Sequence, residues 1–218
     1  MKGMLLYQSS EYDCGPTTLI NAIRFLYERE EIPPALIKAI WNIGNDTFNQ
    51  SGELGKHGTS KAAMRYISEW FNCYAAGCSF PLKTRYYDDE QAAIVDGSPA
   101  IRCLQEGGTV LMRCFSGGYG HYVLLTGIAP QGIELFDPYE ENMPYTMEKD
   151  GIMNIEGYPR RLNRIVTTEV LNRFTTDDYA AGTQEHREVL LFWRTDRPAD
   201  QLQTLDGHAM LKGAAGGK

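Results

Sequence analysis

The sequence lacks a long apolar run, a run of basic residues and the regular cysteine spacing of a disulfide framework. A transmembrane helix needs about 20 mostly apolar residues, and the short apolar run near Met4 is also well below the core of a signal peptide. The formal net charge of -7 is carried without a compensating basic patch, which argues against a nucleic-acid-binding surface. We therefore expect neither a membrane segment nor a nucleic-acid partner.

The five cysteines are odd in number and irregular in spacing. Reduced thiols are the simplest interpretation, and they predict a cytoplasmic protein. Cys73 and Cys78 are not followed by a second Cys or His pair at zinc-site spacing, so we expect no metal. Cys103 and Cys114 lie in apolar segments and are expected in the core. No motif in the sequence indicates a cofactor, and we expect none.

Length and composition are those of one ordinary globular domain, with 218 residues of which 43% are hydrophobic. We expect this domain to span residues 1–206, and the glycine- and alanine-rich segment 207–218 to be disordered. Four helices are predicted in the first half from apolar periodicity and from start signals. They begin after Cys14, at Pro33-Pro34, at Thr59 or Ser60, and at Ser98-Pro99.

The pattern changes at Thr109, where short apolar runs alternate with glycine-containing turns. These runs are typical of β-strands, and helices followed by strands predict an α+β fold. Residues 73–87 and 140–161 are interpreted as a connection and as surface loops. The expected strands are 109–115, 121–128, 132–139 and 188–195.

Cys14 lies at the N-terminal end of a predicted amphipathic helix, whose apolar face includes Leu19, Ile23 and Leu26. The free N–H groups and the dipole at a helix N-terminus favour a thiolate over a thiol. Gly15 would let a substrate carbonyl approach the backbone, whereas the neighbouring Asp13 disfavours a second negative charge. Cys14 therefore fits a nucleophile that needs help from a histidine.

His121 begins one predicted strand and Asp137 ends the next, with the turn APQG between the two strands. If these strands pair, His121 and Asp137 come close at one edge of the sheet. The carboxylate would then orient the imidazole, and the other ring nitrogen would take the proton of Cys14. Gln8 could donate a side-chain N–H to the oxyanion, beside the backbone N–H of Cys14.

Four elements in this order resemble the bacteriocin-processing peptidase family: Gln8, the triplet Asp13-Cys14-Gly15, the run from Gly120 to Val123, and the run Phe136-Asp137-Pro138. These are papain-like cysteine peptidases that cut leader peptides after a double glycine, often as a domain of an ABC transporter. The resemblance covers Gln8 to Asp137. It implies a papain-like α+β fold with a helical N-terminal lobe, which carries the nucleophile helix, and an antiparallel β-sheet lobe.

By the same resemblance, Cys14 is the nucleophile, His121 the general base, Asp137 the orienting carboxylate and Gln8 the oxyanion-hole residue. A peptide or protein substrate and a thioester intermediate are implied, with no cofactor. The family also implies a narrow cleft that accepts two small residues before the cut bond. The sequence departs from the transporter members because it holds no G-x-x-x-x-G-K-[ST] motif.

Plainer interpretations exist for each of these residues. A cysteine at a helix start is often a small buried hydrophobe, and a histidine before an apolar strand can be a core residue. Asp137-Pro138 is a common turn starter, and Gln8 can simply bind backbone. Two alternative functions also stay open: a thiol acyltransferase of transglutaminase-like or acetyltransferase-like type, and a non-catalytic peptide-binding module of the same fold.

Overall fold

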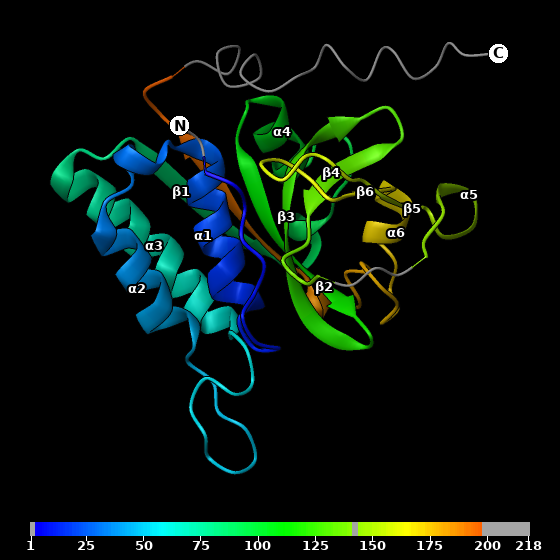
Figure 1. The fold of residues 1–218 in the computed structure, drawn as a ribbon, viewed down its shortest axis with the longest axis horizontal. Coiled ribbons are helices and arrows are strands. Elements are labelled where there is room, and N and C mark those ends of the chain that lie inside the picture. Colours follow the sequence, from blue (N-terminus) through cyan, green and yellow to red (C-terminus); the bar gives the residue numbers. More distant parts are fainter. Residues whose placement is uncertain (1–2, 141–143, 198–218) are drawn as a thin grey trace.

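A seven-stranded antiparallel sheet is the central layer of the part of the chain that the structure describes. The structure is a computed structural model, and it describes residues 3–140 and 144–197. The strand order across the sheet is β1-β7-β2-β3-β4-β6-β5, with helices on both faces (Figure 1). The strands are β1 Leu82–Asp88, β2 Thr109–Ser116, β3 Tyr119–Ala129, β4 Gly132–Phe136, β5 Ile152–Asn154, β6 Arg164–Val166 and β7 Glu188–Arg194.

The three long helices gather on one face of the sheet (Figure 1). They are α1 Cys14–Leu26, α2 Pro34–Gly44 and α3 Lys61–Cys78. Their buried side chains form one continuous core with residues of β2, β3 and β7. A second core lies between the opposite face and the short helices α4 Pro99–Gln105 and α6 Thr168–Leu171. Helix α5, Met147–Asp150, and the 3-10 turns Arg29–Glu31, Asp89–Ala92 and Gln184–His186 complete the described elements.

Because both faces of the sheet are covered, its central strands are apolar on both sides. In β7, Leu190 and Phe192 enter the core with the long helices, whereas Val189 and Leu191 enter the second core. This explains why the strands appear in the sequence as continuous apolar runs rather than as alternating patterns.

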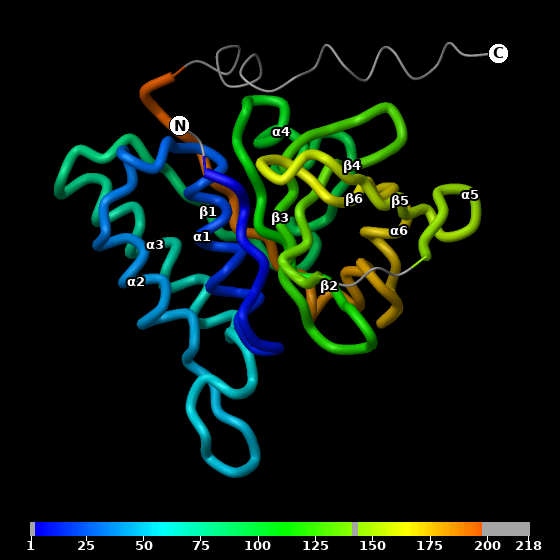
Figure 2. The backbone as a smooth tube through the Cα atoms, in the orientation of Figure 1, coloured from blue at the N-terminus to red at the C-terminus, as the bar shows by residue number. Residues whose placement is uncertain are grey.

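Helix α1 is the most deeply buried helix of the long-helix layer, and polar side chains on it bond neighbouring segments. The Thr18 hydroxyl donates to the carbonyl oxygen of Tyr122 in β3 at 3.0 Å. The Asn21 amide exchanges hydrogen bonds with both backbone groups of Leu6, so the N-terminal segment runs beside α1 (Figure 2). Pro16 lies in the first turn of α1, where its missing N–H has no cost.

The predicted α+β order, with helices first and an antiparallel sheet after, is confirmed. The predicted caps are also found, since the Ser60 and Ser98 side chains accept hydrogen bonds from Ala63 and Ile101. Strands β3 and β4 pair as antiparallel neighbours, and Ala129 is opposite Gly132 across the expected turn.

Two predictions about connections are wrong. Residues 73–87 continue α3 as far as Cys78 and then form the edge strand β1, in which Lys83 and Arg85 stay exposed. Residues 140–161 contain α5 and β5 within their described part. Both strands pair only with later parts of the chain, so no local pattern indicates them. The predicted disorder of residues 207–218 lies outside the described residues.

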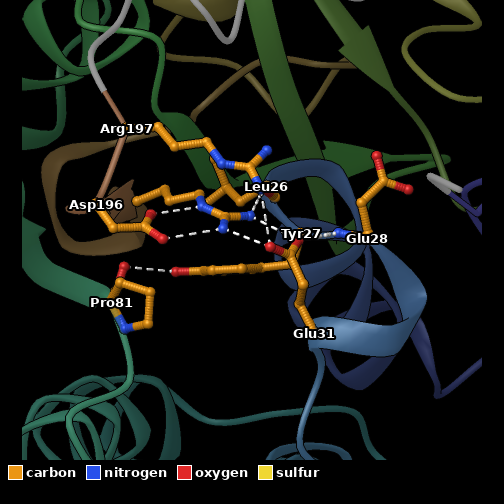
Figure 3. A network of polar contacts seen from close by, with 8 residues as sticks. Leu26, Tyr27, Glu28, Glu31, Pro81, Asp196 and Arg197 are labelled. Carbon is orange, nitrogen blue, oxygen red and sulfur yellow. Dashed lines mark hydrogen bonds and ion pairs between the residues drawn. The ribbon is translucent and has the colours of Figure 1, made fainter.

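Arg194, at the end of β7, connects the sheet to the segment that follows α1. Its guanidinium group donates to both carboxylate oxygens of Glu31, at 2.6 and 2.8 Å, and to Asp196. The guanidinium also lies over the ring of Tyr27, whose hydroxyl donates to Pro81 (Figure 3). The hydrogen bonds from Arg194, more than burial, hold the pKa of Glu31 at about 2.

We expect Glu31→Gln to lower the free energy of unfolding at neutral pH by about 1–3 kcal/mol, because it removes a paired charge next to a buried guanidinium. The Glu31 pKa lies below its unfolded value of about 4.3. Its contribution is therefore complete above that value and is lost as the pH falls towards 2. Denaturant unfolding at several pH values measures both effects.

The control for this prediction is Glu169→Gln. Glu169 pairs with Arg173 at 3.8 Å on the surface, and its side chain is 85% exposed. Such a pair contributes less than about 0.5 kcal/mol. Equal losses in the two variants would contradict the structural role of the Arg194 contacts.

Candidate active site

Cys14, His121 and Asp137 come together where the first residue of α1 meets the sheet. His121 lies near the start of β3, and Asp137 directly follows β4. The Nε2 atom of His121 is 2.7 Å from Oδ1 of Asp137, and the two side chains are only 8% and 5% exposed. The Cys14 side chain lies close enough to the same imidazole ring to contribute to the raised pKa of His121. The three residues that the sequence nominated are thus neighbours in the structure.

Asp137 is held through both carboxylate oxygens and through its backbone. The N–H of Tyr139 donates to Oδ1 and the hydroxyl of Tyr179 donates to Oδ2, each at 2.8 Å. The Asn163 side chain exchanges hydrogen bonds with the backbone N–H and carbonyl of Asp137. Burial alone would raise the pKa of Asp137, but His121 and these donors keep that pKa below its ordinary value. Asp137 is therefore a carboxylate.

The ionisation of His121 follows from its two neighbours. Burial lowers the pKa of His121, but the charge and hydrogen bond of Asp137, together with the hydrogen bond of Cys14, outweigh it and raise the pKa to about 10. Since Nε2 is bonded to Asp137, Nδ1 is the ring nitrogen left for Cys14. An imidazolium in this position stabilises a thiolate as an ion pair.

Packing requires a glycine at position 15. A Cβ atom at this position would collide with the side chain of Thr59, whose hydroxyl donates to the carbonyl of Gly44 at the end of α2. Asp13 precedes α1 but its side chain does not cap the helix. The glycine thus brings the start of α1 close to the segment that leads into α3.

Gln8 lies close to this group of residues through its backbone. Its N–H donates to the carbonyl of Pro138, the residue after Asp137, at 2.9 Å. Its side-chain Nε2 donates to the carbonyl of Ser10 at 2.8 Å, and its Oε1 is buried without a hydrogen-bond partner. An amide nitrogen carries two hydrogens, so one N–H of Gln8 is available for a further acceptor.

Of the remaining cysteines, Cys103 and Cys114 lie buried in the core, as the sequence indicated. Cys73 and Cys78 are exposed on α3. Within residues 3–140 and 144–197, no cluster of three or more His, Cys, Asp or Glu side chains could hold a metal ion. None of the helices in these residues is long and apolar enough to cross a membrane.

Sequence reasoning missed the residues that hold Asp137 in place. Asn163 and Tyr179 follow the last motif by many residues and belong to no recognisable spacing. Their role depends on the packing of β6 and of residues 177–181 beside Asp137, which only the structure places.

No protein-family model matches the chain, and no curated protein matches it. Among solved structures, the chain is similar to the peptidase domain of Streptococcus mutans ComA, with a TM-score of 0.39 and 12% identity over 87% of this chain and 98% of that one. It is also similar to a double glycine motif protease from an AMS/PCAT transporter, with a TM-score of 0.35 and 15% identity over 68% and 86%. That protease was solved in complex with its leader peptide.

We expect Cys14 to be the fast-reacting thiol of the native protein. A thiol held by an imidazolium reacts as a thiolate at neutral pH, whereas an unassisted cysteine is only a few per cent ionised. Iodoacetamide should therefore modify Cys14 about tenfold or more faster than the exposed Cys73 and Cys78. Peptide mass spectrometry of a time course measures the three rates.

The matched variants are Cys14→Ala, which should remove the fast phase, and His121→Ala, which should slow it and move it to higher pH. A fast phase carried by Cys73 or Cys78 would show that the assignment is wrong.

Proposed function

We propose that this protein is a cysteine peptidase, which hydrolyses peptide bonds through a thioester at Cys14. The observation that carries the proposal is the hydrogen bond between His121 and Asp137, with Cys14 beside the same imidazole ring at the N-terminus of a buried helix. The resemblance of the motifs around these residues to bacteriocin-processing peptidases supports the same reaction.

The reaction begins with the thiolate–imidazolium pair of Cys14 and His121. The sulfur attacks the carbonyl carbon of the scissile bond, and the carbonyl oxygen becomes an oxyanion. The backbone N–H of Cys14 and the free N–H of Gln8 donate to that oxyanion. His121 then gives its proton to the leaving amine, which departs and leaves a thioester on Cys14.

In the hydrolysis of the thioester, His121 acts first as a base. The neutral imidazole takes a proton from water, the hydroxide attacks the thioester carbonyl, and the thiolate leaves with the imidazolium restored. Throughout, Asp137 keeps Nε2 of His121 protonated, so that Nδ1 is the nitrogen that exchanges protons with sulfur, amine and water.

A peptide library that includes Gly-Gly sequences, analysed by mass spectrometry, tests this function. The wild-type protein should cleave a subset of the peptides, and Cys14→Ala and His121→Ala should cleave none. Asp137→Asn should lower turnover by up to about ten-thousandfold, because the amide supports neither the tautomer nor the charge of His121.

Two results would redirect or reject the proposal. Products that carry an added amine in place of a free carboxylate would assign the thioester to acyl transfer. Full cleavage by His121→Ala would reject the role of the imidazole.

Gln8 is expected to act on turnover rather than on substrate binding. Loss of one oxyanion donor typically lowers kcat about a hundredfold to a thousandfold. Gln8→Ala and Gln8→Glu should both show this loss with little change in KM, since glutamate keeps the size of the side chain but cannot donate when ionised. Steady-state kinetics on one cleaved peptide separates the two parameters. A change confined to KM would instead assign Gln8 to substrate holding.

A further inference from the structure

Tyr179 contacts the carboxylate that orients His121, from a part of the chain that none of the recognised motifs includes. Its hydroxyl donates to Oδ2 of Asp137 at 2.8 Å, while Oδ1 faces His121. The residue is 4% exposed. Burial and the charge of Asp137 hold the pKa of Tyr179 well above its ordinary value. The hydroxyl therefore stays protonated and remains a donor.

The backbone around Tyr179 is tied to the end of β2. The N–H of Tyr179 donates to the carbonyl of Phe115 at 2.8 Å, and the N–H of Phe115 donates to the carbonyl of Ala180 at 2.9 Å. The neighbouring Asp178 accepts from the N–H of Gly117 and from the hydroxyl of Tyr145. Strand β2 in turn pairs with β3, where Cys114 is opposite His121. Backbone hydrogen bonds to β2 thus hold both the segment of Tyr179 and the strand of His121 in place.

Tyr179 adopts a backbone conformation that is unfavourable for its residue type. Its φ is 63°, in the left-handed region, and in the described residues only Ser79 and Asp89 share this sign among non-glycines. A bulky residue there costs on the order of 1–3 kcal/mol and persists only where its surroundings hold it. Glycine would remove that cost but also the hydroxyl. The conformation directs the phenol towards Asp137.

The hydrogen bonds leave Asp137 with one orientation. Oδ2 is bonded to Tyr179, and Oδ1 is shared between the N–H of Tyr139 and Nε2 of His121. Without the Tyr179 hydroxyl, Oδ2 would lose its hydrogen-bond donor and would be a buried charged oxygen. The carboxylate could then relax only by rotating, which would draw Oδ1 away from His121.

We propose that Tyr179 is a positioning residue, which holds Asp137 so that Oδ1 stays directed at Nε2 of His121 and the ion pair with Cys14 is maintained. The kinetic consequence rests on the proposed peptidase function. The consequence for the reactivity of Cys14 does not, because it requires no substrate.

The test compares Tyr179→Phe with Tyr86→Phe. The control also removes a phenol that donates to a carboxylate, because the Tyr86 hydroxyl bonds Oε2 of Glu188 at 2.9 Å. Tyr179→Phe should lower kcat by about tenfold to a hundredfold, the usual weight of a hydrogen bond to a charged group, with KM within about twofold. It should also slow alkylation of Cys14 at neutral pH and shift the NMR signal of the His121 ring N–H. Tyr86→Phe should leave kcat, alkylation and the NMR signal at wild-type values.

The outcomes separate this inference from the proposed function. If the wild type cleaves peptides and the two variants behave alike, the positioning role is overturned and the peptidase stands. If the wild type cleaves nothing but Tyr179→Phe alone slows alkylation, the positioning role stands and the peptidase function fails. A fall confined to thermal stability would mean that the hydroxyl only stabilises the fold.

A second substitution covers the case in which Tyr179→Phe does not fold. Incorporation of 4-aminophenylalanine at position 179 keeps the ring and supplies a weaker donor. Intermediate kcat with unchanged KM and intermediate alkylation would support the proposal. Wild-type values for both would overturn it.

Discussion

The burial of α1 against the sheet is the constraint on which the rest of the arrangement depends. Eleven of its 13 residues are buried, and the Thr18 hydroxyl bonds the carbonyl of the residue that follows His121. Each buried aliphatic side chain contributes about 1.5–3 kcal/mol relative to an exposed one. A helix held over its whole length cannot tilt without losing much of that free energy. Cys14, as its first residue, therefore keeps its position relative to the imidazole, and the thiol and the ring behave as parts of one rigid body.

The charges of the site limit the pH range in which this rigid body is most stable. The pKa of His121, raised to about 10, exceeds its unfolded value of about 6.5. Its stabilising contribution is therefore complete below that value and is lost as the pH rises towards 10. The pKa of Asp137 is lowered, so its contribution is present above its unfolded pKa of about 3.9 and is lost in acid. The buried pair thus favours the folded state between these limits, where the imidazolium and carboxylate coexist. Removal of one partner would leave a buried charge without compensation.

Much of this arrangement was predictable because it depends on local signals. The amphipathic period after Cys14, the caps at Ser60 and Ser98, and the short turn between β3 and β4 each act within a few residues. That turn pairs β3 with β4, although the register shift between Leu125 and Gly127 is not visible in the sequence. The edge strand β1 escaped prediction because its charged residues face solvent and its partner, β7, lies about a hundred residues further along. The packing role of Gly15 was not predicted for a related reason, since the Thr59 side chain that excludes a Cβ there comes from another segment. The hydrogen bond from the backbone N–H of Gln8 to Pro138 was also not predictable, because Pro138 lies far along the chain from Gln8.

The motifs name the reacting groups, but the residues that orient them come from the second half of the chain. The span from Gln8 to Asp137 contains Cys14, His121 and the carboxylate. The Tyr179 hydroxyl, which donates to the Asp137 carboxylate, and the Asn163 amide, which bonds the backbone of Asp137, lie after that span. Burial raises the pKa of this carboxylate, and the charge and hydrogen bond of His121, together with the donors Tyr139 and Tyr179, oppose that rise. The same burial makes every retained hydrogen bond stronger than it would be in water. It follows that β6 and residues 177–181 help to position Asp137, and that Tyr179 also supports its ionised form and, through it, the raised pKa of His121.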